Sequence, residues 1–171
     1  VLPKPKAGEV IVPKDLSEKE LKDTVGKDAE NAINNEEFKK KLPEGAKVRV
    51  DLDNVKLPKT STPGKAGEVE VPVIYTVNGK EYKTTVKVPV TVVEGTPQIV
   101  PVDPKTAPKA EDSIDPADYP EGAKFKYEKE PDTSSIGDKP VKVIVTDKDG
   151  NELVRVPATV RVVDSTPQFV V

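Results

Sequence analysis

The chain has 171 residues and a formal net charge of −3 at pH 7, with 33% charged and only 4% aromatic residues. It contains no cysteine and no histidine, which excludes disulfides, thiolate metal sites, cysteine nucleophiles and the usual serine–histidine–acid triad. Charges of both signs are interleaved, which gives no basic surface for nucleic acid or an anionic membrane. Because no catalytic or metal-binding motif is recognisable either, we predict no enzyme activity, no cofactor and no metal.

The first residues already show an internal repeat. Val1-Leu2-Pro3-Lys4 resembles Val102-Asp103-Pro104-Lys105, and both segments are interpreted as the start of one copy. Self-similarity at this spacing is typical of tandem domains. We therefore predict a first domain at residues 1–101 and a second domain at residues 102–171.

The first copy then carries an extra strand and an extra helix. The strand is predicted at residues 8–13 and stops at Pro13. Ser17 and Glu20 form a capping box at the start of the helix, and Gly26 is predicted to end it. A helix of about two turns must dock on the domain to be stable. We interpret it as a decoration of the domain, and a partner-binding helix is the alternative.

The repeat continues with matching segments in both copies. Residues 29–33 are echoed by residues 110–114, and a helical turn follows in each copy. The Pro-Glu-Gly-Ala-Lys phrase of residues 43–47 returns at residues 120–124 and predicts a tight turn into a strand. A loop of variable length follows that strand, with Thr60-Ser61-Thr62-Pro63 in the first copy.

Each copy then contains a hairpin. Val71, Val73 and Tyr75 alternate on one face of a predicted strand, matched by valines at positions 141, 143 and 145. The chain turns back at Asn78-Gly79 in the first copy and at Asp149-Gly150 in the second. These dipeptides are typical of two-residue type I′ turns.

The returning strand is the most closely repeated stretch. Residues 88–100 recur, with two residues inserted, as residues 156–170, and each copy runs out through a Thr-Pro-Gln exit. Pro89 and Pro157 fall on the polar face and cannot donate a ladder hydrogen bond. The strand is therefore predicted either to be an edge strand or to be broken so that its halves pair differently.

Short alternating strands joined by hairpins predict a small antiparallel sandwich in each copy. The fold class is all-β with short helices, as two tandem immunoglobulin-like β-sandwich repeats. Proline-rich segments resist bending, so the residues between the copies are predicted to form a short, stiff linker. The linker residues are Thr96, Pro97, Pro101 and Pro104. The two repeats should then form an elongated rod.

Two site hypotheses have plainer alternatives. Residues 147–152 resemble the start of a calcium loop, but the matching turn at Asn78-Gly79 lacks the acidic ligands, which favours an ordinary hairpin. A spontaneous Lys–Asn isopeptide link requires a buried asparagine. Asn151 is the only asparagine of the second copy and falls in a predicted exposed turn, which disfavours the link.

Four aromatic residues could form a glycan-stacking platform or lie in the core: Tyr75, Tyr82, Phe125 and Tyr127. Aromatic residues at alternate strand positions are more often core residues. Because Tyr75 and Phe125 share strand faces with valines, the core interpretation is favoured for them.

The second copy resembles the Rib-type repeat of Gram-positive cell-surface proteins. The residues that carry the resemblance are Ala110–Ile114, Tyr119–Gly122, Phe125–Tyr127, Pro131–Ser134, Gly137–Val141 and Asp149-Gly150. It covers nearly all of residues 102–171 and, less closely, residues 25–101, where the first copy resembles a long variant. The usual Tyr-Pro-Asp-Gly turn of the family is here Asp147-Lys148-Asp149-Gly150.

The resemblance implies an immunoglobulin-like domain repeated head to tail. It implies a structural stalk of an extracellular protein attached to the Gram-positive cell wall, which projects an adhesive region from the cell. The expected partners are neighbouring repeats in the same chain and host surface molecules, with no nucleic acid, no membrane and a monomeric state. The alternative is an adhesin module in which the first repeat binds a host protein or glycan. A rigid spacer inside a wall-bound enzyme is a third hypothesis.

Overall fold

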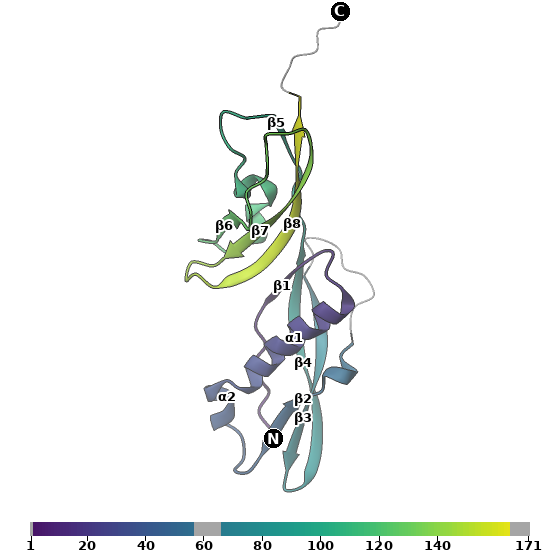
Figure 1. The fold of residues 1–171 in the computed structure, drawn as a ribbon. Helices are drawn as coiled ribbons and strands as arrows, with labels where there is room; N and C mark the ends of the chain where they lie inside the picture. The colour runs from purple at the N-terminus through teal and green to yellow at the C-terminus, as the bar shows by residue number, and fades with distance from the viewer. Residues whose placement is uncertain (1, 57–65, 165–171) are drawn as a thin grey trace, which may run out of the picture. The chain divides into compact units, whose positions relative to one another are not determined.

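The computed structural model describes residues 2–56 and 66–164. Two predicted features lie outside these residues: the loop at Thr60–Pro63 and the second Thr-Pro-Gln exit at residues 166–168. The chain divides into two compact units, residues 1–92 and 93–171. Each unit is built on a strongly twisted sheet, and the protein is mostly β with few helices (Figure 1).

The first unit contains one four-stranded sheet within the described residues. Its strands are β1 (Val10–Pro13), β2 (Lys47–Val50), β3 (Ala66–Val77) and β4 (Lys80–Val93), in the order β1-β4-β3-β2. β3 pairs antiparallel with both β2 and β4. The helical elements are α1 (Glu18–Ile33), α2 (Glu36–Lys40) and the 3₁₀ turn η1 (Leu52–Asn54).

Helix α1 begins as predicted and ends later than predicted. The Ser17 hydroxyl oxygen accepts a hydrogen bond from the Glu20 backbone N–H at 3.1 Å, which confirms the capping box. The predicted stop at Gly26 is wrong, because the helix continues to Ile33 and Gly26 is buried inside it. A Cβ at residue 26 would collide with the Leu52 side chain, so a close tertiary approach explains this glycine.

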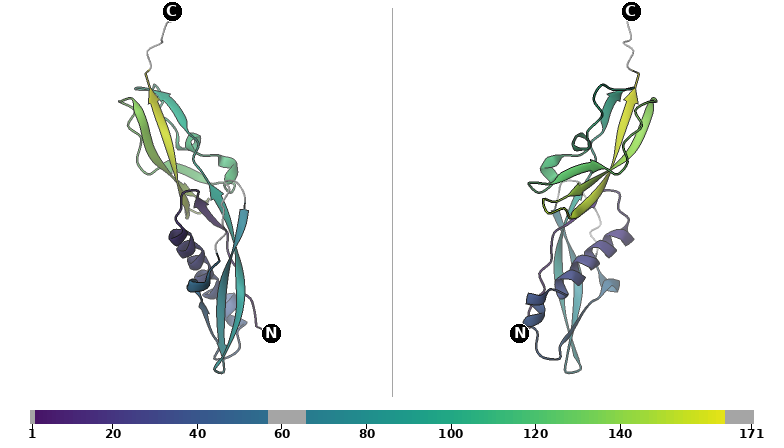
Figure 2. Two further views of the ribbon diagram at one scale, coloured as in Figure 1. Left: turned by 90° about the vertical axis from the view of Figure 1, so that its right-hand side faces the viewer. Right: turned by 60° about the vertical axis from the view of Figure 1, so that its left-hand side comes forward.

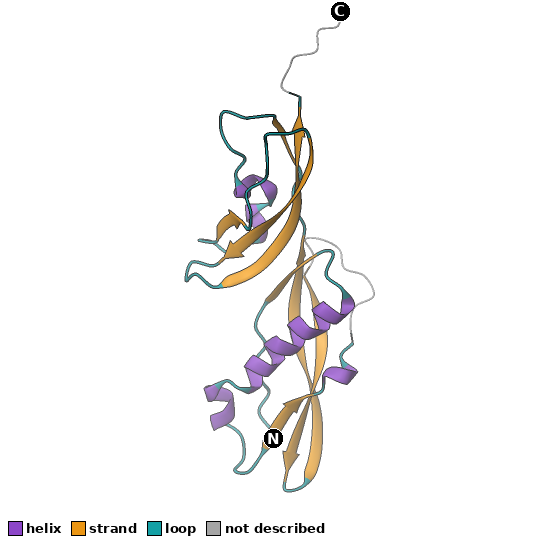
Figure 3. Ribbon diagram, in the orientation of Figure 1, coloured by secondary structure: helices purple, strands orange, loops and turns teal. Residues whose placement is uncertain are grey.

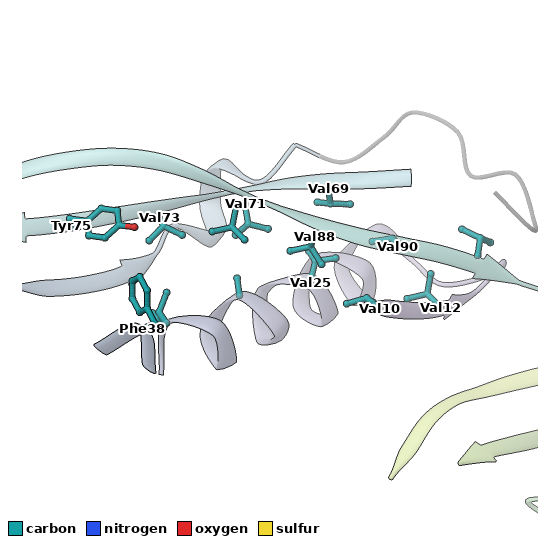
Figure 4. Close-up of a cluster of buried hydrophobic side chains, with 14 residues drawn as sticks. Val10, Val12, Val25, Phe38, Val69, Val71, Val73, Tyr75, Val88 and Val90 are labelled. Atoms are coloured by element: carbon teal, nitrogen blue, oxygen red, sulfur yellow. The ribbon is translucent and has the colours of Figure 1, made fainter. Parts of the chain in front are cut away.

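The core of the first unit lies between α1 and the sheet. Val25 on α1 lies next to Val88 on β4, and both side chains are fully buried (Figure 4). Helix α1 runs across one face of the β3–β4 ribbon (Figure 2). The predicted docking of the helix is therefore confirmed. Full burial of each valine contributes about 1.5–3 kcal/mol, which stabilises a helix that is marginal alone.

The second unit also contains one four-stranded sheet within the described residues. Its strands are β5 (Gln98–Pro101), β6 (Lys124–Tyr127), β7 (Gly137–Thr146) and β8 (Glu152–Val163), in the order β5-β8-β7-β6. β7 pairs antiparallel with β6 and β8, whereas β5 pairs parallel with β8. Two 3₁₀ turns, η2 (Ala110–Ser113) and η3 (Pro116–Asp118), are the helical elements of this unit (Figure 3).

The two sheets have equivalent strand orders, and this corrects two predictions. β1 and β5 both lie beside the last strand of their sheet, and Ile11-Val12-Pro13 matches Ile99-Val100-Pro101 in sequence. The strand at residues 10–13 is therefore the counterpart of β5 and is no addition to the first copy. Because β5 bonds to β8, the chain divides after Val92 and not after Pro101 as predicted.

The prediction that the proline-containing strand is an edge strand is wrong. Pro157 lies in β8, between β5 and β7. Its partner Lys142 turns its carbonyl away from β8 and accepts from the Glu128 N–H at 2.8 Å. Antiparallel pairs alternate between bonded and non-bonded, so Pro157 occupies a non-bonded pair with β7 and breaks no ladder bond there.

Pro89 is accommodated in the same way in the first unit. It lies opposite Glu68, and the carbonyls of Glu70 and Pro72 on the same strand accept hydrogen bonds on the side away from β4. Pro89 therefore also occupies a non-bonded pair. The other predicted alternative was a strand broken at the proline, with halves that pair differently, and β8 comes closer to that description. β7 pairs with β8 on both sides of Pro157, whereas β5 pairs only with residues 160–163, which follow the proline. The immunoglobulin-like sandwich and the rod remain predictions.

Candidate functional site around strand β5

The first predicted turn has the expected geometry. Asn78 and Gly79 have φ angles of 51° and 78°, as a type I′ turn requires, and they connect Val77 directly to Lys80. This confirms the hairpin prediction for the first unit. The turn lies at the end of the β3–β4 ribbon, and its residues belong to a different unit from β5.

The second turn is different from the one predicted. Residues 147–151 separate β7 from β8, and Gly150, with a φ of 85°, donates its N–H to the Asp147 carbonyl at 3.1 Å. The Asp147 carboxylate accepts from the backbone N–H groups of Asp149 and Asn151, both at 2.9 Å. The prediction of a two-residue type I′ turn at Asp149-Gly150 is wrong, because this side chain organises a longer turn.

The same carboxylate is the one that the calcium hypothesis required. Hydrogen bonds, chiefly those from Asn151, hold the pKa of Asp147 below its usual range, as expected for a carboxylate with several donors. Across residues 2–56 and 66–164, no three or more acidic side chains gather in a way that could hold a metal ion. The hydrogen bonds from Asp149 and Asn151 show that Asp147 organises the turn.

The four aromatic residues are divided between the units. Tyr75 is buried, and its hydroxyl donates to the Pro3 carbonyl at 2.6 Å, while Tyr82 lies opposite it with an exposed side chain. Tyr127 is buried on β6. Phe125 is half-buried and packs edge-to-face against Tyr119, with ring centroids 5.6 Å apart. The core interpretation is thus confirmed for Tyr75, whereas Tyr82 remains accessible.

The predicted linker residues gather around β5. Thr96 donates its backbone N–H to the Ser113 carbonyl at 2.8 Å, and Pro101 pairs with Val163. Pro97 separates Thr96 from the strand. Pro104 follows Asp103, which has a φ of 48° and donates its N–H to the Thr133 carbonyl at 2.9 Å. Backbone hydrogen bonds and strand pairing therefore attach Thr96, Pro101 and Asp103 to the second unit.

A polar cluster anchors the start of β5. The amide nitrogen of Gln98 lies 2.6 Å from Ser113 Oγ, 2.8 Å from the Tyr127 hydroxyl and 3.0 Å from the Lys109 carbonyl oxygen. The Tyr127 hydroxyl donates to the same carbonyl at 3.0 Å and lies 3.1 Å from Ser113 Oγ. The cluster joins three segments: β5, β6 and the residues around η2.

This cluster lies inside the unit. Ser113 is completely buried and Tyr127 is buried, while Gln98 is half-buried. Burying such groups is costly unless each finds a partner, and here the partners are each other and one backbone carbonyl. The arrangement therefore fixes the position of β5 as well as stabilising it.

Close backbone contact holds the approach to β5. A Cβ at Gly95 would collide with the Pro157 carbonyl oxygen and would lie 2.6 Å from the Ala158 Cβ. Gly95 is thus a neighbour of Pro157, which the sequence had indicated as a site residue. The sequence reasoning missed Gly95, Gln98, Ser113 and Tyr127 as members of this site. The available signal was the glutamine that recurs after Thr-Pro in both copies.

The arrangement suits a structural role. The side chains of Gln98, Ser113 and Tyr127 hydrogen-bond to one another and to the Lys109 carbonyl, which holds β5, β6 and the η2 region together. Among the helices of the described residues, none has the length and apolar character that a membrane crossing requires.

The unit that contains β5 is similar to a known family of domains. Residues 93–164 match the family model of the Rib domain, and the match begins at the residue where the second unit begins. The Rib domain is a structural repeat of surface proteins from Gram-positive bacteria. A solved Rib structure from Streptococcus pyogenes is 27% identical, covers 42% of this chain and 91% of that chain, and has a TM-score of 0.37. No curated protein matches the chain.

Proposed function

We propose that the chain forms structural repeats in the stalk of a Gram-positive surface protein, because residues 93–164 match the family model of the Rib domain. The stalk is extracellular, attached to the cell wall, and projects an adhesive region from the cell. The equivalent strand order of the two sheets is the observation that carries this proposal. A domain that is repeated along a chain can set the length of a stalk.

The first unit is proposed to be a long Rib-like repeat. It has the same strand order, a proline at the same non-bonded place in its last strand, and a first strand that matches β5 in sequence. Helix α1 is its main addition, and α1 covers a face of the sheet. In both units we further propose an immunoglobulin-like arrangement.

Strand length supports a spacer. β4 has 14 residues and β8 has 12 residues. A strand rises about 3.3 Å per residue, so each of these strands spans roughly 40–45 Å. A single strand that spans its unit separates the two ends of that unit efficiently.

The parallel pairing of β5 with β8 supports a role under tension. When the ends of the second unit are pulled apart, force acts backwards on the start of β5 and forwards on the end of β8. Because these strands are parallel, β5 must slide along β8, and the bonds between residues 98–101 and 160–163 are loaded together. Bonds loaded together resist force better than bonds that are opened one after another.

Small-angle scattering of the full chain tests the stalk proposal. A compact globule of this length has a radius of gyration of about 16 Å. We expect a clearly larger value and an asymmetric distance distribution. A radius near that of the globule would contradict the proposal of an extended pair of repeats.

The second candidate function is an adhesin module in the first unit. An open hollow of about 460 Å³ favours it, lined by residues that include Tyr82, Lys83 and Leu2. Deleting residues 8–26 does not test this candidate, because Val25 is part of the core. The surface variants Tyr82→Ala and Lys83→Glu are the appropriate changes, because both residues line the hollow.

The two functions predict different results for these variants. Both substituted side chains are exposed, so the unfolding transition should be unchanged. Beads coated with each variant would be scored for attachment to host cells. Attachment that is lost with either variant favours the adhesin module, whereas attachment that is absent or unaffected favours the stalk.

A further inference from the structure

The turn of the first hairpin leaves one backbone nitrogen accessible. Asn78-Gly79 is a two-residue loop, and the strand pairing resumes directly beside it, between Val77 and Lys80. Gly79 is exposed, and within the described residues no hydrogen bond engages its N–H. The peptide group between Asn78 and Gly79 can therefore rotate without breaking a bond of its own.

The turn of the second hairpin holds the corresponding nitrogen. Gly150 donates its N–H to the Asp147 carbonyl at 3.1 Å. The Asp147 carboxylate accepts from the N–H groups of the residues on either side, Asp149 and Asn151, both at 2.9 Å. The peptide group between Asp149 and Gly150 can therefore rotate only if bonds of this network are broken.

An asparagine that is followed by glycine can react with the backbone of its own chain. The nitrogen of the glycine attacks the side-chain carbonyl carbon, and the new N–C bond closes a succinimide ring. The attacking nitrogen gives up its proton, which leaves with the amide group as ammonia. Water then opens the ring at either carbonyl, which gives aspartate or isoaspartate. Glycine favours the attack because it has no Cβ to hinder the close approach.

Asn78 is the asparagine of this chain that meets these conditions. It is exposed, and it is the only asparagine that a glycine follows. No other part of the described chain lies within 4 Å of a Cβ built on Gly79, so nothing there crowds the turn. The remaining asparagines are followed by residues whose side chains hinder the attack: Asn31, Asn34, Asn35, Asn54 and Asn151.

We propose that Asn78 is a site of spontaneous deamidation, and that the hydrogen bonds of Asp147 protect the equivalent position of the second unit. The reaction needs only water as a co-reactant. The proposal does not depend on the stalk function. It rests on the different hydrogen bonding of two turns that have similar sequences.

The two products of the reaction should affect the hairpin differently. Aspartate keeps the loop, because Asp-Gly also favours a type I′ turn. Isoaspartate routes the backbone through the side-chain carbon and lengthens the loop, which then no longer fits the pairing of Val77 with Lys80. Chains that carry isoaspartate should therefore unfold in the first unit at a lower urea concentration, while the second unit is unaffected.

Mass spectrometry of peptides from folded chains kept for weeks at 37 °C and pH 8 tests the proposal. The variant Asp149→Asn places the same Asn-Gly dipeptide in the second turn, at an exposed side chain outside the core. This one chain then contains both positions. The amide of Asn78 should be lost, and the amide introduced at position 149 should be retained. Equal loss at the two positions, or no loss at Asn78, would overturn the proposal.

The same variant unfolded in urea separates the effect of the fold from that of the dipeptide. Without the hydrogen bonds of Asp147, both amides should be lost at similar rates. A difference between the two positions that persisted in urea would contradict protection by the turn. Labelling by an isoaspartyl methyltransferase detects the second product, and loss of the Asn78 amide without any isoaspartate would exclude the succinimide route.

Discussion

Gln98 and Ser113 meet in the second unit, with 2.6 Å between the Gln98 amide nitrogen and the Ser113 hydroxyl oxygen. Gln98 opens β5 near the end of the repeated stretch of residues 88–100, and Ser113 lies in a 3₁₀ turn on the far side of a long loop. Their contact fixes β5 as the first strand of the second unit. A segment that the sequence suggested as a linker is thus part of the domain.

Replacing Gln98→Ala should destabilise the second unit by about 1–3 kcal/mol, because the buried Ser113 and Tyr127 hydroxyls lose a partner. Lys109→Ala is the matched control, since Lys109 contributes only its backbone carbonyl and its side chain is exposed. Urea unfolding measures both variants. A loss in the control as large as that in Gln98→Ala would count against the cluster.

Two tyrosines should respond in opposite ways to loss of their hydroxyl groups. The buried Tyr119 hydroxyl has no hydrogen-bond partner among the described residues, so Tyr119→Phe should leave stability unchanged or raise it. Tyr127→Phe removes the bond to the Lys109 carbonyl and a partner of Gln98, and should cost about 1–3 kcal/mol. Thermal unfolding of the two variants gives the comparison, and similar losses would contradict it.

The stability of the second unit should fall in strong alkali because of Tyr119. Burial, with the nearby carboxylates of Asp118 and Asp115, raises the pKa of Tyr119 to about 12 from an ordinary value of 10.0. The folded state therefore holds this proton more tightly than the unfolded state does. The contribution is fully present below pH 10 and is lost between pH 10 and about 12, by about 1.4 kcal/mol per pH unit.

Urea unfolding at pH 9 and at pH 11 measures this loss. Tyr119→Phe is the control, because it keeps the packing against Phe125 and removes the titrating group. Every other ionisable group is the same in both proteins, so its effect cancels in the comparison. If the variant lost stability between these pH values as steeply as the unsubstituted chain, Tyr119 would not be the group responsible.

Gly95→Ala should destabilise the second unit by about 1–3 kcal/mol, because the new methyl group meets the Pro157 carbonyl and the Ala158 backbone, which cannot move aside easily. Gly67→Ala on β3 is a useful comparison, because no atom lies within 4 Å of the added methyl group there. It should be neutral or slightly stabilising. Chemical unfolding of both variants checks the difference, and a tolerated Gly95→Ala would show that the close approach is unimportant.

Local patterns predicted much of each sheet. The alternation of Val71, Val73 and Tyr75 correctly identified a buried face, and Asn78-Gly79 correctly identified a hairpin. The capping box at Ser17 correctly placed the start of α1. These features depend on neighbours in the sequence, so the residues themselves contain the information.

The missed features depend on contacts between distant residues. A repeat can be divided at any point, so the sequence alone did not show that Gln98 belongs to the second domain. Parallel pairing of β5 with β8 leaves no turn signal, because the strands are separated by most of the domain. The helix was predicted to end at Gly26, but it continues, and the glycine is needed there because the Leu52 side chain leaves no room for a Cβ. The turn at Asp147 needed side-chain hydrogen bonds that dipeptide preference does not describe.

Force measured on single chains of residues 1–171, held by tags at the two ends, tests most directly whether β5 and β8 carry load in a stalk. We expect the unfolding step that releases residues 93–164 to require a distinctly higher force in the unsubstituted chain and in Lys109→Ala than in Gln98→Ala. Equal forces in all three proteins, or a second unit that opens without a measurable step, would contradict the account.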